Sequence, residues 1–167
     1  MVPFASWLSG TSLSVALQHQ EQWLWPFCET FHFIGLSLLL GIAGFFDLRL
    51  MGVMKRIPIR AVWKLMPWAI VGFSINLVTG LIFLMAEPRQ YAENISWWLK
   101  VLCLVLAGLN ALVFQTTFRD RIVTLTPGED TPLVLKVVGG VSLATWLGVL
   151  YFGRLMPFWG ASLSAGL

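Results

Sequence analysis

The sequence predicts an all-α integral membrane protein, a bundle of four transmembrane helices that follows an N-terminal interfacial segment. Of its 167 residues, 57% are hydrophobic and only 11% are charged, against about 25% charged in an ordinary soluble domain. Four apolar stretches each exceed the roughly 18 residues that cross a hydrocarbon core of about 30 Å. In lipid a backbone must satisfy its own hydrogen bonds, so each stretch is expected to be helical. We expect a single membrane domain over residues 1–167.

The apolar stretches and the turn-forming residues set the expected limits of each element. Residues 1–26 precede the first stretch and carry apolar groups such as Trp7, so we expect them to lie in the membrane interface. Pro58 lies in the first connection, Pro88 follows the second helix, and Pro127 and Gly128 lie in the third connection. The transmembrane helices are predicted at about 27–50, 63–86, 96–117 and 133–157.

The distribution of lysine and arginine predicts the orientation, because loops rich in these residues face the cytoplasm. The first and third connections are basic, whereas Arg89 in the second is balanced by Glu87 and Glu93. We therefore expect a multi-pass protein of a bacterial inner membrane with both termini on the periplasmic side. The expected outer helix ends carry an interfacial belt of tryptophans, namely Trp23, Trp25, Trp97, Trp98 and Trp159.

Four ionisable side chains are predicted at similar depth near the outer ends of three helices. Glu29 and His32 lie one turn apart in the first helix, Lys100 lies in the third, and Arg154 lies in the fourth. Ionisable groups are costly inside a bilayer and mark candidate functional sites. We therefore predict an outer-leaflet ligand pocket formed by these four residues, with His32 as a metal or haem ligand. The alternative is that Lys100 and Arg154 reach to the headgroups and that His32 only packs.

Other polar residues are expected to be structural. Asp47 and Arg49 should form an ion pair at the cytoplasmic end of the first helix, and Asn76 and Asn110 should hydrogen-bond between helices. The two cysteines, Cys28 and Cys103, fit no zinc motif and are expected to be packing residues.

Counting ligands limits the cofactors that this chain can hold. Bis-histidine haem needs two histidines, but His19 lies outside the predicted spans, which leaves His32 with a second ligand such as methionine. Haem b, a quinone and copper are all candidate cofactors. The sequence has no nucleophile elbow, phosphate loop or dinucleotide fingerprint, so we do not expect an enzyme. Its basic residues do not alternate with exposed aromatics, which argues against a nucleic-acid partner.

Short motifs along nearly the whole chain carry a family resemblance. They are Leu13-Ser14-Val15-Ala16, residues 29–35, residues 47–52, Pro67-Trp68, Gly72-Phe73, Lys100, residues 108–110, Trp146 and residues 153–157. Together they resemble a family of small bacterial inner-membrane proteins of unknown function, which implies a four-helix membrane fold. More remotely, the architecture is similar to copper-resistance D-type and cytochrome b-like membrane bundles, although this chain lacks the several histidines of a bis-histidine cytochrome.

These observations lead to one functional expectation and two alternatives. We expect a non-catalytic subunit of a larger respiratory or metal-handling assembly, with a role in electron transfer or metal or haem binding at the pocket around Glu29 and His32. Its partners would be the lipid bilayer and either other proteins or further copies of itself. The first alternative is a small proton-coupled transporter in which Glu29 and His32 are the coupling residues. The second is a purely structural membrane scaffold.

Overall fold

The computed structural model describes residues 2–19, 21–126 and 128–164, which are helical apart from short connections. Four helical spans are long and apolar enough to cross a membrane, Gln22–Leu50, Ile59–Ala86, Ile95–Ile122 and Leu133–Trp159. The expectation of an all-helical chain with four long apolar helices is therefore confirmed. The elements in chain order are α1 (Val2–Ser9), α2 (Ser12–Gln18), α3 (Glu21–Leu50), α4 (Ile59–Trp63), α5 (Met66–Ala86), α6 (Pro88–Ala92), α7 (Ile95–Val113), the π-helix η1 (Phe114–Phe118), α8 (Arg119–Thr124) and α9 (Leu133–Ser164).

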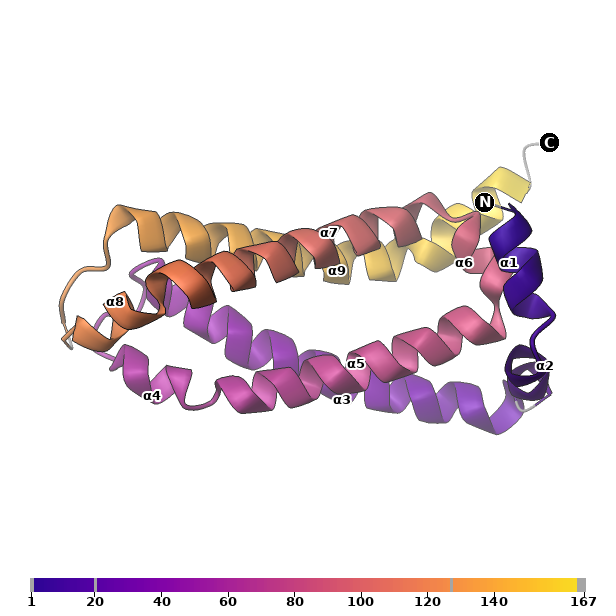
Figure 1. Ribbon diagram of the computed structural model, residues 1–167, viewed down its shortest axis with the longest axis horizontal. Helices are drawn as coiled ribbons and strands as arrows, with labels where there is room; N and C mark the ends of the chain where they lie inside the picture. Colours follow the sequence, from indigo (N-terminus) through magenta and orange to yellow (C-terminus); the bar gives the residue numbers. More distant parts are fainter. Residues whose placement is uncertain (1, 20, 127, 165–167) are drawn as a thin grey trace.

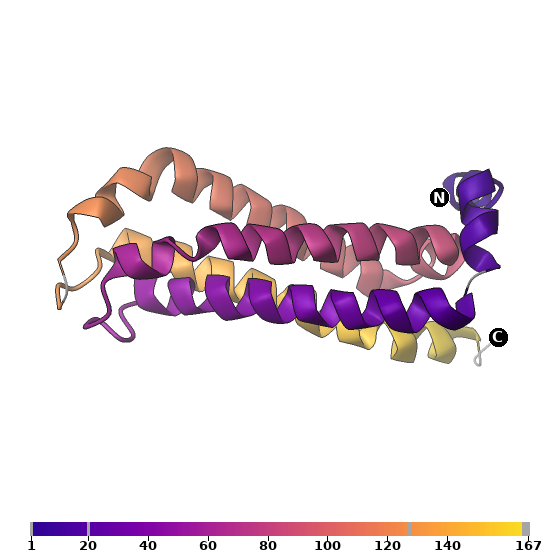
Figure 2. The same cartoon turned by 90° about the horizontal axis from the view of Figure 1, so that it is seen from below.

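The four long helices lie side by side as two hairpin-like pairs (Figures 1 and 2). Helix α3 packs on α5, α7 packs on α9, and the contact of α3 with α9 joins the two pairs. Within the described residues, α5 and α7 do not pack along their lengths. Helices α1 and α6 and the last turns of α9 lie at one end of the bundle, here called the terminal end, and α4 and α8 lie at the other, the loop end (Figure 1).

Glycines allow the closest approaches between helices, as is usual for helix packing in membranes. A Cβ atom at Gly72 would lie 2.7 Å from the Gly35 carbonyl oxygen and 2.8 Å from the Leu39 nitrogen. Helices α3 and α5 therefore touch backbone to backbone at this point. Similarly, a Cβ atom at Gly139 would lie 2.9 Å from the Asp47 carbonyl oxygen, which brings α9 onto α3 near the loop end.

Both cysteines are free and act as packing residues, as predicted. Cys28 is buried. A Cβ atom at Gly148 of α9 would lie 2.8 Å from Cys103 Sγ, so the thiol of α7 fills the space that this glycine leaves. The α7–α9 contact thus also depends on a glycine.

The N-terminal segment consists of two short helices at the terminal end of the bundle (Figure 1). Helix α1 contacts α6, and α2 contacts α5. The Thr11 side chain caps α2 by accepting a hydrogen bond from the Ser14 backbone N–H. The Ser14 hydroxyl donates to the Met85 carbonyl oxygen at 2.6 Å, which ties α2 to the end of α5. The two short helices therefore pack on α5 and α6 while other side chains of theirs, such as Trp7, are exposed.

The first long helix starts earlier than predicted, at Glu21 rather than at about residue 27. The predicted start is the beginning of the long apolar stretch, and Pro26, just before it, lacks the N–H of an ordinary helical residue. Pro26 nevertheless lies inside α3. The ring of Trp25 packs on that of Phe83 in α5, with 4.9 Å between centroids. This contact between helices holds the first turns of α3 in place, and sequence reasoning could not foresee it.

The second and third helices are each divided near the loop end. A turn at Lys64 and Leu65 separates α4 from α5, whose first turn contains Pro67. The third helix continues past the predicted end at about residue 117 through η1 into α8. A π-helical turn inside a helix produces a kink, and Figure 2 shows the chain bending there. The fourth helix extends beyond the predicted residue 157 to Ser164.

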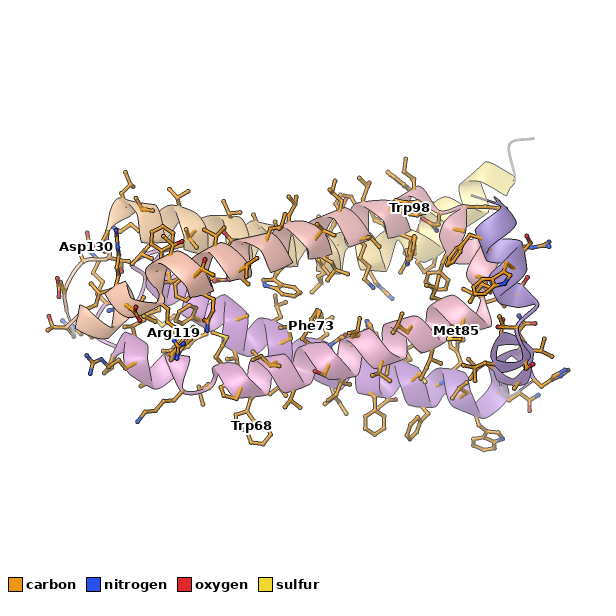
Figure 3. All side chains as sticks on the ribbon, viewed as in Figure 1. Trp68, Phe73, Met85, Trp98, Arg119 and Asp130 are labelled. Atoms are coloured by element: carbon orange, nitrogen blue, oxygen red, sulfur yellow. The ribbon has the colours of Figure 1, made fainter. Side chains whose placement is uncertain are left out.

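An aromatic cluster forms the core at the loop end. The rings of Phe46, Trp63 and Phe114 lie 5.4 to 5.6 Å apart, measured between centroids. They come from α3, α4 and η1, and buried side chains such as Leu50 and Ile122 surround them. Nearer the middle of the bundle, Phe73 points from α5 toward the other helix pair (Figure 3), where its ring meets Trp146 of α9 at 6.3 Å.

Candidate functional site

His32 lies on α3 with its imidazole directed toward α5. Its Nδ1 atom is 2.7 Å from Thr79 Oγ1. The ring packs beside Phe83, with 5.7 Å between centroids, and a Cβ atom at Gly80 would lie 3.8 Å from its Cε1 atom. Residues from two neighbouring turns of α5 therefore hold the imidazole in one orientation.

The hydrogen bonds of Thr79 determine the tautomer that we assign to His32. The Thr79 hydroxyl donates to the Ile75 carbonyl oxygen at 2.7 Å, and a hydroxyl has only one proton to donate. With its proton on Ile75 the hydroxyl accepts from His32, and on this basis we assign the imidazole proton to Nδ1, which leaves the lone pair on Nε2. A histidine that binds a metal or haem iron has this arrangement, in which the second ring nitrogen donates to a fixed partner. The sequence analysis did not single out Thr79.

Lys100 of α7 also points into the bundle. A Cβ atom at Gly153 of α9 would lie 3.7 Å from its Cδ, Cε and Nζ atoms, so the lysine stem runs along the α9 backbone. Lys100 is close enough for its charge to act on His32. Among the described residues it has no hydrogen-bond or ion-pair partner. The bundle therefore places a cation without a counter-ion near an imidazole that has a free lone pair.

Glu29 and Arg154, the other two residues of the predicted pocket, are exposed. In the described part of the chain no hydrogen bond or ion pair joins Glu29 to His32. The charge of Glu29 acts instead on Tyr91 of α6, whose pKa is raised to about 12 by burial and by the nearby Glu87 and Glu29. The structure thus brings His32 near Lys100 but leaves the two exposed residues outside this pair.

No group of three His, Cys, Asp or Glu side chains within the described residues could hold a metal ion. His19, the second histidine, follows α2 as its C-cap and is exposed. An open groove of about 610 Å³ lies beside α2 and the start of α3, and it is apolar, with Leu17, Trp23 and Phe27 among its lining residues. The donor set around His32 consists of one imidazole, one hydroxyl and one ammonium group.

The structural polar residues are arranged partly as predicted. Asn110 of α7 donates to the Val138 carbonyl oxygen of α9 at 3.1 Å, the interhelical hydrogen bond that we expected. Asn76 instead donates to the Gly72 carbonyl oxygen in its own helix at 3.0 Å, and its amide nitrogen lies against Gly35 of α3, where a Cβ atom would be 2.6 Å away.

The predicted ion pair between Asp47 and Arg49 is not formed. Arg49 is 1% exposed, and its Nε atom donates to the Ile57 carbonyl oxygen at 2.7 Å while Nη1 donates to Thr131 Oγ1 at 3.3 Å. Asp47 is directed elsewhere, since it lies against α9. Side chains two positions apart on a helix do not share a face, and the carbonyl and hydroxyl of two loops bind the guanidinium instead.

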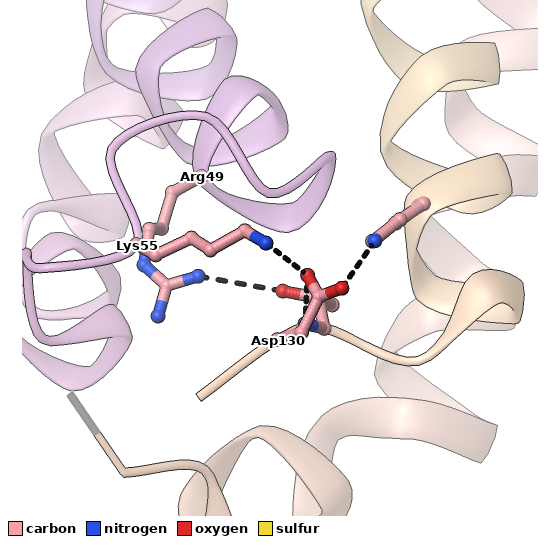
Figure 4. Close-up of polar contacts among 5 residues, drawn as sticks. Arg49, Lys55 and Asp130 are labelled. Carbon is pink, nitrogen blue, oxygen red and sulfur yellow. Dashed lines mark hydrogen bonds and ion pairs between the residues drawn. The ribbon is translucent and has the colours of Figure 1, made fainter. Parts of the chain in front are cut away.

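Arg49 belongs to a polar network that joins the first and third connections at the loop end (Figure 4). Asp130 binds Lys55 at 3.0 Å and Lys136 at 2.9 Å. Hydrogen bonds from these two lysines hold the pKa of the Asp130 carboxyl at about 2, below its ordinary value. The sequence analysis used the lysines only as signals of orientation, because nothing local shows that loops about 75 residues apart meet.

Comparison of the chain with protein-family models, curated proteins and solved structures finds no match. The resemblance to small four-helix inner-membrane proteins therefore stays a prediction.

Proposed function

We propose that this chain is a non-catalytic, membrane-spanning subunit that binds haem or a quinone between its helices at His32 and Lys100. The observation that carries this proposal is the His32–Thr79 hydrogen bond. Because Thr79 donates to Ile75, the imidazole presents an unprotonated Nε2 in a fixed orientation. Such an atom can bind haem iron or accept a hydrogen bond from a quinol hydroxyl.

Lys100 supplies the complementary charge. Its ammonium group would pair with a haem carboxylate or donate to a quinone carbonyl. A metal ion held by protein side chains alone fits this site less well, because the described residues offer no set of three ligands. Haem or a quinone, when bound, would supply the redox chemistry. The residues of this chain would bind and orient it and would exclude water.

The membrane orientation is part of the proposal. With the loop end in the cytoplasm, the basic first and third connections and the Asp130 network face the cytoplasm of a bacterium. The exposed side chains of Trp23, Trp98 and Trp159 belong to helix ends at the terminal end, where they would lie at the periplasmic interface. A reporter enzyme that is active only outside the cytoplasm, fused after the last residue, should be active, and the same reporter inserted after Asp120 should not.

The test of the site uses the full chain purified in mild detergent. We would record its reduced-minus-oxidised visible spectrum and extract the same sample for quinones. The expected result is a stoichiometric haem signal or a co-purified quinone that is lost in His32→Ala and weakened in Thr79→Val. His19→Ala is the matched control, because it removes the other histidine from an exposed position, and it should retain the ligand. Wild-type protein with neither haem nor quinone would refute the proposal.

A purely structural scaffold is the second candidate. The observation in its favour is that Thr79 already satisfies one nitrogen of His32, while glycines set the helix contacts. A scaffold predicts that His32→Ala changes stability and leaves the composition of the purified sample unchanged.

A further inference from the structure

Asp47 is a buried carboxyl group at the contact between α3 and α9. It is 4% exposed, and its backbone lies so close to α9 that a Cβ atom at Gly139 would be 2.9 Å from its carbonyl oxygen. The Ser142 hydroxyl of α9 is near enough to donate to the carboxyl. Its Oδ2 atom has no hydrogen-bond partner within the described residues. A buried polar atom without a partner in a native fold calls for an explanation.

No cation in the described structure balances a charge on Asp47. Helix α5 has no ionisable residue, and the cationic residues of α9 are Lys136 and Arg154. Lys136 is bound to Asp130, and Arg154 is exposed on the other half of α9. Arg49, in the same turn as Asp47, donates to the carbonyl and hydroxyl groups of the two loops.

Helix α4 also packs on α3. The charged residue of α4 is Arg60, which is exposed. The position of Asp47 within α3 also disfavours a negative charge. Asp47 lies in the last turn of α3, where the negative end of the helix dipole opposes a further negative charge. A buried carboxylate without a cation loses its hydration and becomes neutral by taking up a proton.

We propose that Asp47 is a proton-binding site between α3 and α9, which carries its proton at neutral pH and contributes no charge to the bundle. The site is separate from His32, since 15 residues of helix at roughly 1.5 Å each place the two about 22 Å apart along α3. It goes beyond the haem or quinone proposal and does not depend on it. Release of the proton would leave a negative charge at the point where Gly139 brings the two backbones together.

Infrared spectroscopy of the full chain in lipid vesicles tests this proposal directly. A protonated carboxyl has a C=O band that a carboxylate lacks, and labelling with ¹³C-aspartate shifts this band only for aspartates. The chain has three aspartates, Asp47, Asp120 and Asp130, and the last two are exposed. We expect a labelled C=O band at pH 7 that disappears in Asp47→Asn, persists in Asp120→Asn and declines as the pH is raised.

Two results would overturn the proposal. One is a labelled wild-type spectrum without a protonated-carboxyl band at pH 7. The other is loss of the band when sodium replaces potassium at constant pH, because the site would then bind a metal cation. If Asp47→Asn does not fold, labelled wild-type protein compared with Asp120→Asn and Asp130→Asn still gives the answer, since the band must survive both exposed substitutions.

Discussion

The contact between Gly35 and Gly72 makes a specific prediction, that Gly72→Ala destabilises the bundle. The added methyl group would lie 2.7 Å from the Gly35 carbonyl oxygen, 2.8 Å from the Leu39 nitrogen and 3.2 Å from Leu38 Cβ. Ordinary van der Waals contact begins at 3.4 Å, so the helices must separate by about 0.7 Å. The two nearest atoms belong to the backbone, so no change of rotamer can relieve the clash.

The expected loss follows from the cost of overpacking a rigid contact. Overpacked sites typically lose about 1 to 3 kcal/mol, and displacement of α3 from α5 should place this variant in the upper part of that range. For a chain of this size each kcal/mol lowers Tm by roughly 2 to 4 °C. The measurement is the thermal or detergent-induced unfolding midpoint of purified protein, followed by helical circular dichroism.

The chain provides matched controls for this substitution. At Gly41 and Gly108 an added Cβ atom would have no neighbour within 4 Å. Alanine should be neutral there or stabilise the helix by up to about 1 kcal/mol, because glycine is the poorer helix former. The reasoning about the α3–α5 contact is wrong if Gly72→Ala is as stable as Gly41→Ala.

Three further substitutions have expected outcomes. Asp130→Asn should destabilise the loop end at neutral pH. Because the pKa of Asp130 in the folded protein is lowered to about 2, the loss of stability relative to wild type should be complete above the ordinary pKa of an aspartate and should vanish as the pH falls toward 2. Unfolding midpoints of both proteins across this pH range would show it. Asn94→Ala should cost about 1 to 2 kcal/mol in unfolding free energy, because Asn94 caps α7 through the Ser96 N–H and donates to the Met156 carbonyl oxygen. Phe114→Ala should lower the unfolding free energy by about 3 to 5 kcal/mol, since it leaves a cavity in the aromatic cluster at the loop end. A loss of unfolding free energy below about 1 kcal/mol would mean that the kinked helix moves inward and fills the cavity.

The two ends of the bundle differ in what their polar groups do. At the loop end, Asp130 and Arg49 bind partners from other segments and hold the connections together. In the terminal half, His32 and Lys100 keep an unshared lone pair and an unpaired charge within the described structure. His32 and Lys100 are the basis of the proposed ligand site, and the loop-end network of Asp130 and Arg49 has a structural role.

Local chemistry in the sequence was sufficient to predict the helices and some of their limits. Apolar stretches longer than a bilayer crossing became the four long helices, because hydropathy and backbone hydrogen bonding are properties of each segment alone. The turn around Pro58 and the helix start at Leu133 also followed from local residues. The start of α3 did not follow from them, since the helix begins at Glu21, before the apolar stretch, and Trp25 packs there on Phe83.

Only the tertiary structure decided which faces meet. In a chain whose helices are apolar on most sides, no polar face marks the side that packs, and many glycines could equally form a close contact. The pairing of Gly35 with Gly72 and the hydrogen bond between His32 and Thr79 both depend on how the helices are rotated. The sequence lists the ionisable residues, whereas their partners are set by contacts between segments far apart in the chain.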